Sequence, residues 1–132
     1  MIGFANHWSW GSTSYETQKL LMNNVGDRVL ASTATESPMF RQVVTVDDAT
    51  GELIVKVVNA QPAPAPTTVE LGREVAPAAR VTRSQGDPAV VNTPDSQPIR
   101  PAEATFDCAA ATFTCTFPPN SVTFLRIRPT QP

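Results

Sequence analysis

The longest run of strand-forming sequence in this chain covers residues 42–59. Two runs rich in β-branched residues, 43–46 and 53–58, enclose five residues, 47–51, which contain two aspartates and end in glycine. These residue types favour a hairpin loop, because aspartate bonds its own backbone and glycine adopts positive φ. Apolar residues occupy both faces of the second run, which is typical of a strand inside a sheet. The pattern predicts a central β-hairpin.

Shorter strand-like segments surround this hairpin and are separated by polar or proline-rich stretches. Residues 1–5 are expected to form a buried strand that leaves through a loop at residues 6–11. A polar connection is expected at residues 27–38, and a long polar loop with several prolines at residues 85–101. Further strands are predicted at residues 67–71, 79–83, 104–108 and 121–127.

One helix is predicted at residues 14–23. Thr13 and Glu16 form a capping box at its start, and Gly26 follows it as a stop signal. One side of this helix is apolar and must pack on another part of the protein. The residues of this apolar stripe are Tyr15, Leu20, Leu21, Met22 and Val25.

Composition agrees with a mainly β protein. The 132 residues include 13 prolines and 6 glycines, and only 17% of them are charged, which favours short strands and extended loops over a helical bundle. The length suits one domain with a single core, and no internal repeat is present. We predict an antiparallel, jelly-roll-like β-sandwich with one short N-terminal helix.

Charge and hydropathy narrow the choice of partners. The net charge of −2 leaves no basic stripe for a phosphate backbone, so we expect no nucleic-acid partner. No apolar run approaches the length that spans a bilayer, and residues 1–5 lack the basic start of a signal peptide, so neither feature is expected within these residues. A neutral partner such as a glycan fits this composition better.

Two cysteines, Cys108 and Cys115, lie on either side of a short segment that resembles a second hairpin, from Phe106 to Phe117. Their spacing suits no zinc site, because zinc takes four ligands and His7 is the only histidine in the chain. Two interpretations remain open: a disulfide across the hairpin, which an oxidising compartment favours, or two free thiols.

The sequence contains no recognisable pair of catalytic carboxylates. A retaining glycosidase needs two carboxyl groups about 5 Å apart on a rigid scaffold. Glu16 is explained as a helix cap, and the other glutamates, including Glu52 after the hairpin glycine, are expected to lie on solvated surface. Asp47 and Asp48 are explained by turn chemistry. We therefore expect no catalytic residue, no metal and no cofactor in this chain.

His7, Trp8 and Trp10 form the most distinctive cluster of side chains. Two neighbouring tryptophans can provide a platform for sugar rings, but aromatic side chains also pack against neighbouring protein. Both interpretations remain open, and packing is the more common of the two.

Four segments of this chain carry a resemblance to a known family. They are SYETQKLLMNNVGDRVL at residues 14–30, TGELIVKVVN at 50–59, VVNTPDSQPIRP at 90–101 and FPPNSVTFLRI at 117–127. In this order they resemble the C-terminal part of the α-L-arabinofuranosidases of glycoside hydrolase family 51. The resemblance implies a (β/α)₈ catalytic barrel followed by a β-sandwich, and retaining release of terminal arabinofuranose by two glutamates of the barrel.

Such a barrel needs about 250 residues, so the resemblance implies that both catalytic glutamates lie outside this sequence. Residues 1–26 then correspond to the last strand and helix of the barrel, and residues 27–132 to the C-terminal sandwich. His7, Trp8 and Trp10 fall on the loop at the barrel face where active sites gather.

The resemblance implies a non-catalytic domain that supports the barrel of a secreted enzyme acting on plant cell-wall arabinan or arabinoxylan. Its partners are the catalytic barrel and the polysaccharide. Two alternatives remain: a carbohydrate-binding module, marked by a row of exposed aromatic side chains, and an independent adhesion or interaction domain.

Overall fold

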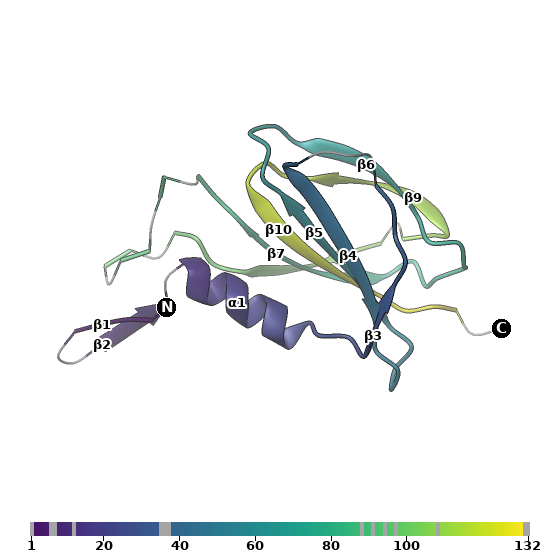
Figure 1. The fold of residues 1–132 in the computed structure, drawn as a ribbon, viewed down its shortest axis with the longest axis horizontal. Coiled ribbons are helices and arrows are strands. Elements are labelled where there is room, and N and C mark those ends of the chain that lie inside the picture. The colour runs from purple at the N-terminus through teal and green to yellow at the C-terminus, as the bar shows by residue number, and fades with distance from the viewer. Residues whose placement is uncertain are drawn as a thin grey trace.

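The computed structural model shows a layered β protein with one helix beside it (Figure 1). The structure describes residues 2–5, 8–11, 13–34, 38–87, 89–90, 92–93, 95–96, 98–107 and 109–130, and of residues 2–5, 8–11, 13 and 14 the backbone alone. In chain order the elements are β1 (Ile2–Ala5), β2 (Trp8–Gly11), α1 (Thr13–Asn23), β3 (Arg28–Leu30), β4 (Phe40–Val46), β5 (Leu53–Asn59), β6 (Ala65–Glu70), β7 (Ala79–Gln85), β8 (Ala102–Phe106), β9 (Thr112–Phe117) and β10 (Ser121–Ile127).

The larger sheet contains six antiparallel strands in the order β3-β4-β5-β10-β7-β8. The predicted central hairpin is confirmed as β4 and β5, which pair from Phe40–Asn59 to Val46–Leu53. Its loop uses the expected chemistry, because Asp47 Oδ1 accepts from the Ala49 backbone N–H at 2.9 Å and Gly51 has φ 74°. The C-terminal strand β10 lies between β5 and β7, so the last strand of the chain occupies the middle of this sheet.

The smaller sheet, β6 and β9, packs against one face of the larger sheet and completes the sandwich. We call this the inner face. The core between the sheets combines apolar residues of β5, β7 and β10 with Phe113, Cys115 and Phe117 of β9. The antiparallel sandwich with one helix confirms the predicted fold class.

The predicted second hairpin from Phe106 to Phe117 is wrong. β8 pairs with β7 in the larger sheet, whereas β9 pairs with β6 in the smaller one. The chain crosses between the sheets where the sequence pattern indicated a turn. The rings of Phe106 and Phe113 nevertheless meet, with centroids 5.5 Å apart, because they face each other across the core.

Two boundaries near the N-terminus also differ from the expectation. Residues 8–11, expected in a loop, form β2, which pairs antiparallel with β1 in a separate sheet. The polar connection at residues 27–38 contains the short edge strand β3, which pairs with β4. A strand of three residues carries too little alternation for its pattern to be recognised.

The helix matches its predicted bounds to within one residue, but its predicted apolar stripe is wrong. Leu20 is 6% exposed, whereas Leu21, Met22 and Val25 are 44%, 76% and 66% exposed. Leu20 and Asn24, one turn apart, are the buried positions, so a narrower stripe than expected contacts the sheet. No helix in the described part of the chain is long and apolar enough to cross a bilayer.

Candidate functional site

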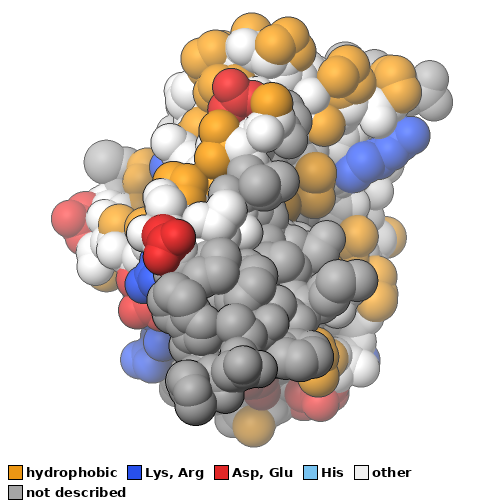
Figure 2. Space-filling model, turned by 90° about the vertical axis from the view of Figure 1, so that its left-hand side faces the viewer, with side chains coloured by type: hydrophobic (Ala, Val, Ile, Leu, Met, Phe, Trp, Pro, Cys, Tyr) orange, Lys and Arg blue, Asp and Glu red, His pale blue; other side chains and the backbone are white. Residues whose placement is uncertain are grey.

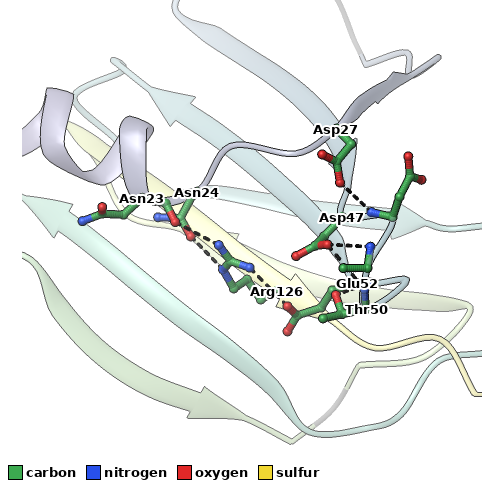
Figure 3. A network of polar contacts seen from close by, with 9 residues as sticks. Asn23, Asn24, Asp27, Asp47, Thr50, Glu52 and Arg126 are labelled. Atoms are coloured by element: carbon green, nitrogen blue, oxygen red, sulfur yellow. Dashed lines mark hydrogen bonds and ion pairs between the residues drawn. The ribbon is translucent and has the colours of Figure 1, made fainter.

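Arg126, near the end of β10, joins helix α1 to the larger sheet (Figure 3). Its Nε donates to Asn24 Oδ1 at 2.9 Å, and its Nη2 donates to the backbone carbonyl of Asn23 at 2.9 Å. The last carbonyls of a helix have no partner within the helix and carry partial negative charge. The guanidinium therefore stabilises the C-terminal end of α1 and fixes its position on the sheet.

The same guanidinium binds Glu52, which immediately precedes β5. Arg126 Nη1 lies 3.1 Å from Glu52 Oε2, and the two side chains are only 14% and 12% exposed. The expectation that Glu52 lies on solvated surface is wrong. The register explains why: Ile54 pairs with Arg126, and Glu52 stands two residues before Ile54 on the same side of the sheet.

The turn after α1 is packed closely on β4. Asn24 Nδ2 donates to the Leu20 carbonyl at 2.8 Å, and the Asp27 backbone N–H donates to the Val46 carbonyl at 2.8 Å. A Cβ on Gly26 would lie 2.5 Å from the side chain of Thr45. Gly26 is thus required by its close approach to β4, because any side chain at this position would collide with Thr45.

A surface ion pair continues this connection to the hairpin loop. Arg28 Nη2 lies 2.7 Å from Asp48 Oδ1, and the Asp48 backbone N–H donates to Asp27 Oδ2 at 2.8 Å. Asp48 raises the pKa of Arg28 by its hydrogen bond and its charge. We call the group formed by these contacts the helix–sheet joint; it consists of Asn23, Asn24, Gly26, Asp27, Asp48, Glu52 and Arg126.

The chemistry of the joint is that of a fixed connection. A carboxylate bound by arginine directs its lone pairs to the guanidinium. Across the described ranges, no three His, Cys, Asp or Glu side chains are gathered so that they could hold a metal ion. Glu70, Glu74 and Glu103 are exposed, as expected.

The aromatic side chains of the described sandwich are buried or half-buried. Phe117 is fully buried and meets Phe40 edge to face, with ring centroids 5.9 Å apart. Both rings line an open groove between β6 and the β3–β4 side of the larger sheet. No aromatic side chain that the structure describes is more than half-exposed, so these residues present no row of rings for sugars.

The side chains that the sequence suggested as site residues lie mostly outside the part of the chain that the structure describes. His7 is outside the described residues, and Trp8 and Trp10 are described only as backbone positions of β2, opposite Ala5 and Gly3. Cys115 is buried, and burial raises the pKa of its thiol while the charge of Arg83 lowers it to a smaller extent. Cys108 lies outside the described residues, so its disulfide with Cys115 stays a prediction.

The role of Arg126 was not predicted, although the sequence contains a signal for it. Arg126 is the one charged residue of a strand that is otherwise apolar or hydroxylated, SVTFLRI. An arginine in a buried strand needs a carboxylate or carbonyl partner. The position of that partner depended on strand order, which the sequence pattern did not determine.

The two packed antiparallel sheets and the helix on the larger one define the chain as a β-sandwich domain. The model of the α-L-arabinofuranosidase C-terminal domain family matches residues 1–121. The chain belongs to this family, and the resemblance found in the sequence is confirmed.

Individual relatives agree with this assignment. An extracellular exo-α-L-arabinofuranosidase of Streptomyces chartreusis is 57% identical over 90 residues, which are 67% of this chain and 11% of that protein. The arabinose-bound α-L-arabinofuranosidase MgGH51 superposes with a TM-score of 0.90 at 25% identity, covering 98% of this chain and 21% of the other. A thermostable GH51 enzyme of Thermotoga petrophila RKU-1 shares the fold with a TM-score of 0.84 at 14% identity. The chain thus spans only a small part of the length of these relatives.

Proposed function

We propose that this chain is the non-catalytic C-terminal domain of a longer α-L-arabinofuranosidase and that its role is to support a separate catalytic part. The family assignment and the small share of each relative that the chain covers support this proposal. The longer protein would release terminal α-L-arabinofuranosyl residues from arabinan or arabinoxylan. The relative from Streptomyces is described as extracellular, which supports a secreted enzyme.

The helix–sheet joint is the observation that carries the supporting role. Arg126 fixes the end of α1 to the two central strands through three groups, and Gly26 seats the following turn directly on β4. A helix held in this way fixes the preceding part of the protein relative to the sandwich. Residues 1–26, which contain the β1–β2 pair and α1, would then come from the end of the catalytic barrel, with His7, Trp8 and Trp10 near its substrate face.

The test is an arabinofuranosidase assay of the purified 132-residue chain on an aryl α-L-arabinofuranoside. We expect no turnover above background, because a retaining site needs two carboxyl groups about 5 Å apart and Glu52 is bound by Arg126. The longer protein serves as the positive control. Turnover by the isolated chain that is abolished by Glu52→Gln, or by glutamine at another glutamate, would contradict the proposal.

A further inference from the structure

Helix α1 divides the outer face of the larger sheet, which is the face turned away from β6 and β9, into two unlike halves. Arg126 of β10 binds the C-terminal end of α1, and Thr17, near the N-terminal end of the helix, borders the same groove as Val58 and Val122. The helix therefore runs along β10. Below it lie Ile54 and Phe124, which are fully or almost fully buried. The parts of the outer face beside the helix are formed by β7–β8 and by β3–β4–β5.

The two halves differ in polarity. On the β7–β8 half the outward residues are polar, with Arg80, Glu103 and Thr105 exposed. On the other half the exposed fractions of Val29, Val43 and Val58 are 75%, 45% and 42%. Strand register places Val29 beside Thr45, Val43 beside Lys56, and Val58 beside Arg41. We call Val29, Arg41, Val43, Lys56 and Val58 the open face.

Lys56 occupies the middle of the open face. It is half-buried between Val43 on β4 and Phe124 on β10, and no salt bridge forms to it within the described part of the chain. Burial lowers the pKa of Lys56, and the nearby charge of Arg126 lowers it further. An ammonium group that loses water without gaining a carboxylate is costly, so this site favours an anionic partner.

Hydrophobic side chains are visible among polar ones on the side of the molecule drawn in Figure 2. Met22 and Val25, on α1 and in the turn after it, are 76% and 66% exposed. Val25 immediately precedes Gly26, which rests on Thr45 between the outward residues Val29 and Val43. Exposed apolar groups therefore continue from the open face to the end of the helix, as is typical of a surface that another protein unit covers.

The open face suits a different protein unit better than a second copy of itself. Its charged groups are Arg41 and Lys56, and it carries no carboxylate, so a twofold contact would place like charges together. The relatives supply such a unit, because this chain covers 11% of one and 21% of another and matches a C-terminal domain family.

We propose that the open face is the surface on which the catalytic part of the longer protein docks, and that a carboxylate of that part lies against Lys56. The inference rests on the proposed function, because it takes the occupant from the longer arabinofuranosidase. Val29, Val43 and Val58 supply apolar area at this contact, and Lys56 gives it specificity.

The chain offers a matched control, because its only lysines are Lys56 and the exposed Lys19 on α1. Treatment of the longer protein with a zero-length carbodiimide should link Lys56 to an aspartate or glutamate outside these 132 residues. Acetylation of Lys56 should be about tenfold slower in the longer protein than in the isolated chain, since a covered amine reacts only when the contact opens. In the isolated chain, Lys19 gives the reference rate for an exposed lysine.

Equal acetylation rates of Lys56 in the two proteins, or its cross-linking only within the 132 residues, would overturn the inference. The arabinofuranosidase assay on the same samples separates the two proposals. An active longer protein with an accessible Lys56 contradicts the docking surface alone. A protected, cross-linked Lys56 in a protein without arabinofuranosidase activity contradicts the proposed function and leaves the docking surface intact.

Discussion

Replacement of Arg126 by methionine is expected to lower the free energy of unfolding of the isolated chain by about 3 kcal/mol, as expected for breaking a largely buried ion pair. Methionine keeps the aliphatic volume but leaves the Glu52 carboxylate with little water and no cation. It also removes donors from Asn24 Oδ1 and the Asn23 carbonyl. In thermal unfolding followed by circular dichroism, the midpoint should fall by about 10 °C.

Arg128 provides the control, because it lies two residues further along the chain and is exposed. Arg128→Met should change the unfolding midpoint by only a degree or two, as expected for a surface substitution of about 0.5 kcal/mol or less. The double variant Arg126→Met with Glu52→Met should regain part of the loss, since the buried carboxylate is then gone. If Arg126→Met were no more destabilising than Arg128→Met, the helix–sheet joint would not hold the helix.

Replacement of Asn59 by alanine is expected to be at least as destabilising, by about 3–4 kcal/mol, because several buried polar groups would lose their partners. Asn59 is fully buried at the end of β5. Its Nδ2 lies within hydrogen-bond distance of the carbonyls of Ala63, Phe117 and Pro118, and its Oδ1 accepts from the Gln61 backbone N–H at 3.1 Å. One side chain thus joins β5, the loop after it and the β9–β10 turn.

Two variants make the Asn59 result specific. Asn23→Ala removes the same side-chain atoms from an exposed helix position and should leave the unfolding midpoint nearly unchanged. Asn59→Asp keeps the size of the side chain but places an acceptor against three carbonyl oxygens, so it should lose more stability than Asn59→Ala. Denaturant titration of the three variants gives the comparison. A milder effect for aspartate than for alanine would show that the amide donors are not the stabilising groups.

Local patterns were sufficient for the parts of the fold that local physics determines. The β4–β5 hairpin follows from β-branched runs and the Asp and Gly chemistry of its loop, and β10 was predicted with its observed bounds of Ser121 and Ile127. Helix α1 was located by its capping box and Gly26. In each case the deciding interactions lie within a few residues of one another.

Contacts between distant segments could not be read in the same way. The pairing of β8 with β7 and of β9 with β6 depends on sheet order, so two adjacent strand signals were mistaken for a hairpin. Glu52 was placed on the surface for the same reason, because its partner Arg126 is 74 residues away. The contact with Arg126 fixes which side of α1 faces the sheet. Leu20 is buried and Met22 is exposed for this reason.

The most direct test of the supporting role is the thermal inactivation of the longer arabinofuranosidase with and without residues 27–132. The proposal predicts that truncation after Gly26 shortens the half-life of activity at elevated temperature by about tenfold or more, because unfolding of the unsupported catalytic part governs inactivation. The KM at low temperature should change little, since the proposed catalytic site lies elsewhere. An equal half-life for the truncated and complete proteins would contradict the proposal that this sandwich supports the enzyme.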